Sequence, residues 1–219
     1  MCFSAVASFS AGSVLSVAGV ITTQKAQSRP QLAFAIIPFL FGIQQLSEGF
    51  VWLSLTHQQY AHVQQTATHT FLFFAHALWP AWVPFAALLF EDKQPQKNII
   101  FSIFILGLVL GFAEIFFLST YHVEARIYGH HIEYLITYPK LFVTISEVVY
   151  GITTLLPCFV SSFKKMRWFA IILATSLMFA NLFYRAWLIS VWCFFAALLS
   201  CIIYYILSQQ NEKEILAVA

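Results

Sequence analysis

Long apolar runs, separated by turn-forming or charged residues, dominate the hydropathy pattern of this chain. A helix that crosses a bilayer needs about 20 predominantly apolar residues. Seven runs come near this length, and they cover residues 4–22, 32–55, 69–90, 98–119, 140–161, 168–185 and 187–207. The pattern predicts an all-α fold, an integral membrane bundle of seven transmembrane helices. This domain would fill residues 1–208, and residues 209–219 would form a short cytoplasmic tail.

One segment between these runs has a different period. Over residues 121–137, apolar and polar side chains alternate on both sides of Gly129. Alternation with period two indicates strands, and a glycine between two such stretches favours a tight turn. We therefore expect a small β-hairpin here, lying over the outer mouth of the bundle. A short amphipathic helix is the alternative.

The basic residues indicate how the bundle is oriented. If the helices alternate in direction, eight Lys and Arg residues fall on one side and three on the other. The larger group is Lys25, Arg29, Lys93, Lys97, Lys164, Lys165, Arg167 and Lys213, and the smaller group is Arg126, Lys140 and Arg185. Because Lys and Arg concentrate in cytoplasmic loops, we expect the N-terminus and the hairpin outside and the C-terminus inside.

The composition narrows the class of partner. Hydrophobic residues make up 60% of the 219 residues and charged residues only 9%, whereas a soluble domain carries about 25% charged residues. The net charge of +2 is small and the basic residues are scattered, so the chain has no nucleic-acid-binding patch. The lipid bilayer is the expected partner.

Four ionisable side chains inside the predicted spans stand out by their depth: Glu48, His76, Glu114 and Glu147. Counted from the outer end of its helix at about 1.5 Å per residue, each lies roughly 9–12 Å below the outer boundary. Ionisable groups at such depth cost about 2–3 kcal/mol each and normally face the bundle interior. We therefore expect these four side chains, from four different helices, to meet in one layer in the outer half of the bilayer.

Carboxylates and imidazole are ligands for divalent transition metals. The leading hypothesis is a metal-binding site for Zn, Cu or Fe made by this layer. If the metal were catalytic, it would act as a Lewis acid or activate water, on a small-molecule or lipid substrate. Three polar residues near the same depth are expected to orient the ligands: Gln44, Gln45 and Asn181.

Three further residues are candidate outer ligands or gates: Cys2, His130 and His131. Cys2 directly precedes the first span, and a thiolate is a strong ligand for Zn or Cu; an interfacial residue or a lipidation site is the alternative. His130 and His131 lie at the expected hairpin turn. Three further outer histidines, His57, His62 and His69, lie in a polar segment and are expected to face solvent.

Other functions stay open beside the metal hypothesis. Some carboxyl groups could be protonated, because burial and mutual repulsion disfavour their charged form, and the protein would then be a proton-coupled transporter or channel. The inner half offers only weak polar groups such as Ser102, Thr154 and Ser176, which argues against a continuous path. The layer could also be purely structural, or the protein a membrane sensor or assembly factor. The sequence contains neither the His-Glu-x-x-His motif of zinc proteases nor the Gly-x-Ser-x-Gly motif of serine hydrolases. Whether the protein is an enzyme therefore stays open.

Three stretches of sequence resemble a known family. They are the opening Met1-Cys2-Phe3-Ser4-Ala5, the segment 41–52 (Phe-Gly-Ile-Gln-Gln-Leu-Ser-Glu-Gly-Phe-Val-Trp), and Trp79-Pro80 with Val83-Pro84. Together they are similar to small, uncharacterised bacterial membrane proteins of comparable length and helix number. The resemblance implies a location in the bacterial inner membrane and brings no established activity. It places Cys2, Gln44 and Glu48 inside the resembling segments.

Overall fold

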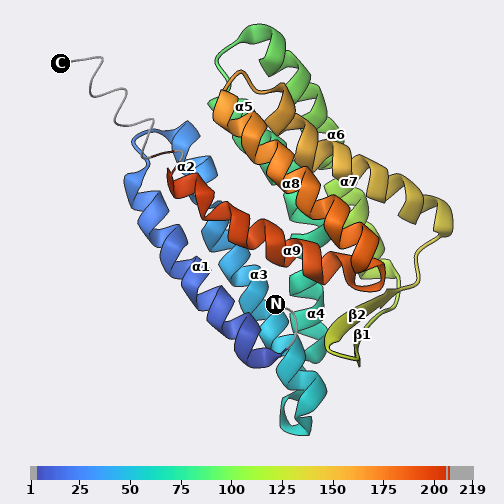
Figure 1. Ribbon diagram of the computed structural model, residues 1–219. Coiled ribbons are helices and arrows are strands. Elements are labelled where there is room, and N and C mark those ends of the chain that lie inside the picture. Colours follow the sequence, from blue (N-terminus) through green and yellow to red (C-terminus); the bar gives the residue numbers. More distant parts are fainter. Residues whose placement is uncertain (1–3, 206, 208–219) are drawn as a thin grey trace.

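The computed structural model describes residues 4–205 and 207, and its described part is built almost entirely from helices. The elements are α1 (Ala5–Lys25), α2 (Arg29–Ala35), α3 (Ile37–Thr56), η1 (Gln58–Val63), α4 (Gln64–Leu72), η2 (Phe73–Leu78), α5 (Trp79–Phe90), α6 (Gln94–Thr120), β1 (Val123–Tyr128), β2 (His131–Ile136), α7 (Lys140–Val160), α8 (Lys164–Phe183), η3 (Arg185–Trp187) and α9 (Leu188–Ser200). Figure 1 shows α1 and α3 side by side, with α9 crossing the bundle and the hairpin at one end.

Among the described residues, six helical segments are long and apolar enough to cross a membrane. They match the first six predicted spans, and the protein is therefore an integral membrane protein with a helical bundle. The seventh predicted span, 187–207, contains a shorter apolar helix over Ser190–Tyr205. That this helix also crosses the bilayer stays a prediction, as does the orientation of the bundle.

The third span begins earlier than the predicted residue 69. A continuous helical segment runs over Gln58–Phe90, and its first turns, η1 and the start of α4, are polar and exposed. The apolar run marks only the part of a helix that lies in lipid, so a helix that extends past the membrane surface is longer than its apolar run.

Prolines divide two of the spans into shorter elements. α2 ends and α3 begins around Ile36, next to Pro38, and η2, a stretch of wide π-helix, directly precedes Trp79 and Pro80. Proline has no N–H to donate to the carbonyl four residues earlier, and its ring crowds that carbonyl. π-helical turns of this kind occur mostly at functional sites. Here the irregular turn carries His76.

Small residues let α1 and α3 approach each other closely. A Cβ atom added at Gly12 would lie 2.8 Å from the Leu46 side chain, and one added at Gly19 would lie 2.4 Å from the Phe39 backbone nitrogen. Contacts of small residues allow helices to pack backbone to backbone in a membrane. The two antiparallel helices therefore form one closely packed unit. Within this unit, α3 carries Gln44, Gln45 and Glu48.

The predicted hairpin is confirmed. β1 and β2 pair in antiparallel fashion from Val123–Ile136 to Tyr128–His131, and Gly129 adopts a positive φ of 63° in the turn. One face of the hairpin packs on the bundle, with Ala125 in a cluster of apolar residues from α3 and α4. The alternative, an amphipathic helix, is wrong for this segment, because period-two alternation places one apolar face of a strand pair on the bundle.

The end of the bundle opposite the hairpin is held by a buried carboxylate. Glu91, only 1% exposed, follows α5 and accepts hydrogen bonds from the Ser161 hydroxyl (3.1 Å), the Ser162 hydroxyl (2.6 Å), the Ser162 N–H (2.7 Å) and the Lys93 N–H (3.1 Å). Burial by itself would raise the pKa of Glu91, but these hydrogen bonds, those of Ser162 foremost, lower it below its usual value. The carboxylate thereby ties the α5–α6 loop to the α7–α8 loop.

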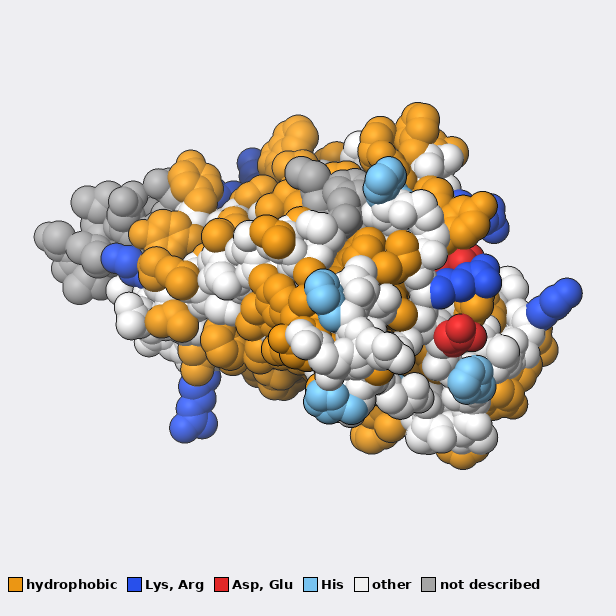
Figure 2. Space-filling view, turned by 90° about the horizontal axis from the view of Figure 1, so that it is seen from below, with side chains coloured by type: hydrophobic (Ala, Val, Ile, Leu, Met, Phe, Trp, Pro, Cys, Tyr) orange, Lys and Arg blue, Asp and Glu red, His pale blue; other side chains and the backbone are white. Residues whose placement is uncertain are grey.

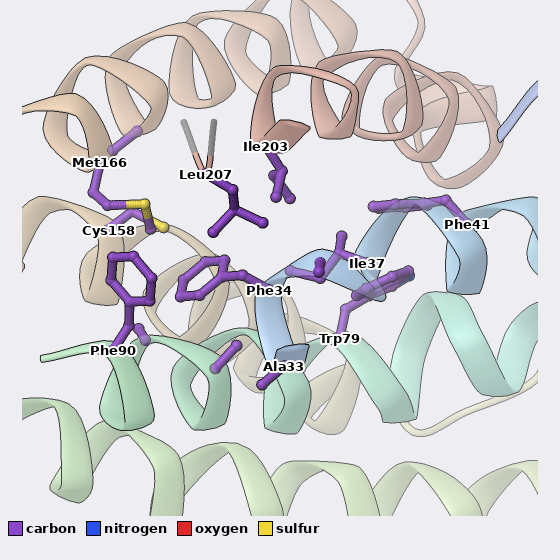
Figure 3. Packing of buried hydrophobic residues seen from close by; sticks show 14 of the residues in the cluster. Ala33, Phe34, Ile37, Phe41, Trp79, Phe90, Cys158, Met166, Ile203 and Leu207 are labelled. Atoms are coloured by element: carbon purple, nitrogen blue, oxygen red, sulfur yellow. The ribbon is translucent and has the colours of Figure 1, made fainter. Parts of the chain in front are cut away.

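The largest apolar cluster lies toward this same end. Figure 3 shows Phe34, Phe90, Cys158 and Leu207 converging from different helices. A cavity of about 50 Å³ adjoins the cluster and is lined almost wholly by apolar groups, among them Phe41, Trp79 and Ile203. The half of the bundle away from the hairpin thus has an apolar interior.

Candidate functional site

Glu48 lies in the bundle interior near the hairpin end. Its side chain on α3 is fully buried, and the Ser190 hydroxyl at the start of α9 donates a short hydrogen bond to its Oε1. A buried carboxyl group requires such partners, since each lost hydrogen bond to water would otherwise destabilise the fold. Ser190 is the polar residue that sequence reasoning missed, because a serine inside an apolar run carries no distinctive signal.

A second polar contact lies one turn away on α3. The Trp79 indole N–H donates to Gln44 Oε1 at 2.8 Å, and both side chains are buried. The Cys193 thiol of α9 lies beside Gln44 and Glu48. The adjacent Gln45 is fully buried, and neither atom of its amide has a hydrogen-bond partner among the described residues. Buried amides without partners are rare in native proteins, so this region is unusually rich in unused hydrogen-bonding capacity.

His76 and Glu114, two of the predicted site residues, contact each other. The His76 Nδ1 atom lies 3.6 Å from Glu114 Oε2, and Glu114 is 1% exposed. Two glycines on α6 allow this approach: Cβ atoms added at Gly107 and Gly111 would lie 1.9 Å from the Pro80 carbonyl oxygen and 2.8 Å from that of Ala77. The close packing of α6 on η2 and α5 therefore sets the distance between the imidazole and the carboxyl group.

Two tyrosines surround this pair. Tyr138, just before α7, is buried, and burial together with the nearby Glu114 carboxylate raises its pKa well above the usual value. Its hydroxyl has no hydrogen-bond partner among the described residues. Tyr150 on α7 lies near both Glu114 and Cys193. Tyr150 thus stands between the His76–Glu114 pair and the group around Glu48.

Glu147 and Asn181 line a separate polar cavity beneath the hairpin. Its volume is about 170 Å³, and its wall consists of Ile132, Tyr134, Glu147, Asn181, Arg185, Trp187, Leu188 and Ser190. Ser190 is therefore shared between this cavity and Glu48. Glu48, His76 and Glu114 are not part of the cavity wall. Arg185, which the sequence suggested only as a loop charge, is the cationic side chain of the cavity.

The two histidines of the hairpin have different surroundings. His130 is exposed in the turn, whereas His131 is buried and its ring stacks on Trp187 with centroids 4.5 Å apart. Burial lowers the pKa of His131, and the neighbouring His130 adds to the effect. The described structure therefore gives His131 a packing role, holding the hairpin against η3.

The other outer histidines make local contacts. His57 Nδ1 lies 2.8 Å from the Thr56 hydroxyl, and the Nδ1 atoms of His62 and His69 bond to backbone carbonyls one turn earlier. Figure 2 looks at the hairpin end from below and shows histidine side chains spread over this face. They are surface residues of the polar first turns of the third span. Cys2 lies outside the described residues.

The predicted layer is thus divided into two pairs and a cavity. His76 contacts Glu114, Glu48 contacts Ser190, and Glu147 shares a cavity with Asn181. Within residues 4–205 and 207, no group of three or more His, Cys, Asp and Glu side chains lies close enough to hold a metal ion. Zinc sites use at least three protein ligands. The described residues alone do not bring three together, and Cys2, one of the predicted ligands, lies outside them, so the Zn, Cu or Fe centre stays a prediction.

Comparisons with known proteins place the chain in a family but do not assign an activity. No curated protein and no solved structure matches it. One family model does match, over residues 1–217, and its description is a family of unknown function (DUF6629). Because the match covers almost the whole length, the chain belongs to this family.

Proposed function

We propose that the protein binds a small polar molecule or the polar part of a lipid in the hairpin-side half of the bilayer. The observation that carries this proposal is the cavity of about 170 Å³ beneath the hairpin, whose wall holds Glu147, Asn181 and Arg185. Ligand sites are concave and combine apolar walls with a few convergent polar groups. We further propose that this half faces the exterior of a bacterial inner membrane, as the distribution of Lys and Arg favours.

The buried groups behind the cavity support the same function. Ser190 belongs to the cavity wall and also donates to Glu48, so a ligand at the wall would alter the hydrogen bond of a buried carboxyl group. Tyr150 and Cys193 continue the polar contacts toward Glu114 and His76. The buried layer thus lies directly behind the cavity, on the side that Ser190 shares with it.

The alternatives have less support in the geometry. A transporter or channel needs a polar route through the other half, but there the cavity wall is almost wholly apolar and includes Phe34, Phe41 and Ile203. A metal centre needs a third ligand beside His76 and Glu114, and the described residues do not supply one. No contact among the described residues specifically favours a sensor or an assembly factor.

A ligand panel tests the proposal. Thermal unfolding of the purified full chain in detergent would be followed with transition-metal salts, simple anions, amines and zwitterions. Since a ligand at about 100 times its Kd stabilises the folded state by about 2.7 kcal/mol, at least one class should raise the unfolding midpoint. Asn181→Leu, which removes an amide from the cavity wall, should abolish the shift. Asn98→Leu, at an exposed position near the start of α6, is the matched control and should retain it.

Two results would contradict the proposal. One is a panel in which no class raises the midpoint of the wild-type chain. The other is a shift of equal size in the wild type and in Asn181→Leu, which would place the ligand elsewhere. Elemental analysis of the same samples tests the metal hypothesis separately, and a stoichiometric metal lost in His76→Ala would revive it.

A further inference from the structure

The cavity beneath the hairpin contains opposite charges that do not pair with each other. Glu147 of α7 and Arg185 of η3 both belong to its wall. In the described part of the chain the ion pairs are His76–Glu114 and Arg126–Glu133, so neither cavity charge has a charged partner there. Unpaired charges next to lipid are costly. Such a pair on one wall is suited to a ligand that fits between its members.

We infer that this cavity binds a zwitterion, a ligand that carries one ammonium group and one phosphate or carboxylate. The inference rests on the proposed function and names the class of its ligand. A zwitterion neutralises Glu147 and Arg185 together. A simple anion would leave the carboxylate uncompensated, and a simple cation would leave the guanidinium uncompensated, each at the desolvation cost of a charge near lipid.

Each wall group matches one part of such a ligand. The Arg185 guanidinium presents several N–H donors in a plane, a geometry that binds phosphate or carboxylate with two parallel hydrogen bonds. The Glu147 carboxylate accepts hydrogen bonds from an ammonium group. The Asn181 amide can bind either part of the ligand, because it donates through its nitrogen and accepts through its oxygen. The volume of about 170 Å³ is large enough for several non-hydrogen atoms.

The remaining wall is aromatic and apolar. Tyr134 and Ile132 of β2 cover the cavity from the hairpin, and Trp187 and Leu188 close it at the start of α9. An ammonium group is attracted to the face of a tryptophan ring. Strand β2 therefore supplies part of the cavity wall, and His131 stacked on Trp187 holds it in place.

Such a zwitterion can come from water or from the membrane. Glycerophosphoethanolamine, a phosphodiester with one negative and one positive charge, is a free molecule with this chemistry, and the same group is the headgroup of phosphatidylethanolamine. Both sources would place a phosphate on Arg185 and an ammonium group near Glu147. The experiment therefore needs one arm without lipid and one arm in which only the lipid headgroup changes.

In the first arm, binding of glycerophosphoethanolamine, ethanolamine and inorganic phosphate to the detergent-solubilised full chain would be measured by isothermal titration. The zwitterion is expected to bind at least tenfold more tightly than either fragment. Glu147→Gln and Arg185→Gln should each weaken its binding at least tenfold. Arg126→Gln removes the same charge from the hairpin, outside the cavity wall, and should bind like the wild type.

In the second arm, unfolding midpoints would be compared in nanodiscs of phosphatidylglycerol with and without phosphatidylethanolamine. A membrane source predicts that phosphatidylethanolamine raises the midpoint of the wild type and of Arg126→Gln but not of Arg185→Gln. A response to the free zwitterion alone indicates the aqueous source. Either result supports the zwitterion.

The inference is overturned if neither arm responds, or if ethanolamine or phosphate alone binds as tightly as the zwitterion. This comparison of ligands uses the wild-type chain, so it decides even where a charge variant does not fold. If another class in the ligand panel stabilises the wild type and loses its effect in Asn181→Leu, the proposed function stands and only the zwitterion is wrong. If no class does, both fail.

Discussion

Gly107 offers the sharpest test of how the candidate site is held together. A Cβ atom at this position would lie 1.9 Å from the Pro80 carbonyl oxygen and 2.7 Å from the Pro80 carbonyl carbon. Ordinary contact begins at 3.4 Å, so Gly107→Ala forces α6 and α5 apart by about 1.5 Å. The obstacle is backbone rather than the end of a flexible side chain, and it cannot turn away.

The magnitude follows from two opposing terms. Alanine is favoured over glycine in a helix by about 1 kcal/mol, while overpacking typically costs about 1–3 kcal/mol and more where backbone must shift. We expect Gly107→Ala to lower the free energy of unfolding by about 2 kcal/mol net. It should also lengthen the 3.6 Å approach of His76 to Glu114, since both lie on the elements that are pushed apart.

The assay is equilibrium unfolding in mixed micelles, followed by circular dichroism as sodium dodecyl sulfate is added. Gly151→Ala is the matched control, because a Cβ atom at Gly151 of α7 has no atom within 4 Å. This variant should gain up to about 1 kcal/mol from helix propensity alone. Equal stabilities of the two alanine variants would refute the close packing of α6 on Pro80, and with it the account of how His76 meets Glu114.

Three further predictions concern single contacts. Glu91→Ala removes an acceptor of four hydrogen bonds and should lower the free energy of unfolding at pH 7 by about 2–4 kcal/mol. Because the pKa of Glu91 is lowered in the folded chain, this difference from the wild type should shrink as the pH falls below 4.5. A difference in the free energy of unfolding that does not depend on pH would contradict this. The pKa of buried His131 is also lowered, so a released hairpin takes up a proton first and acidification from pH 6.5 should loosen the hairpin. The hydrogen-exchange protection factors of residues 123–136, which are corrected for the intrinsic pH dependence of amide exchange, should fall in the wild type and stay constant in His131→Phe. Trp79→Phe deprives Gln44 of its donor and should cost about 1–3 kcal/mol, whereas Trp168→Phe, at a position 67% exposed, should leave the unfolding curve in place.

The membrane architecture could be predicted from the sequence because it depends on local properties. An apolar run of about 20 residues must form hydrogen bonds within itself in lipid, and only a helix allows this for a single segment. The hairpin was predictable for a similar reason, since period-two alternation around Gly129 is a local signal. The start of the third span at Gln58 was not predictable, because its first turns lie outside lipid and are polar.

The partners within the site could not be predicted in this way. Counting residues along a helix gives the depth of a side chain, but its partner depends on how neighbouring helices are rotated and tilted. Glu48 and Ser190 are 142 residues apart in the chain. A serine among apolar residues gives no sequence signal that identifies its hydrogen-bond partner. Equal depth therefore suggested one cluster, whereas the rotation of the helices produces two pairs and a cavity.

The distribution of polarity inside the bundle limits what the site can do. The polar side chains from Glu147 to His76 lie on the hairpin side, while the other cavity is bounded by apolar groups around Phe41 and Trp79. A charged ligand that entered beneath the hairpin would meet this apolar region as a barrier, because burying its charge there without partners costs several kcal/mol. Ligand and protons would therefore enter and leave on the same side. A chain built in this way suits the proposed function, the binding of a ligand at one membrane surface, beneath the hairpin whose Ile132 and Tyr134 line the cavity.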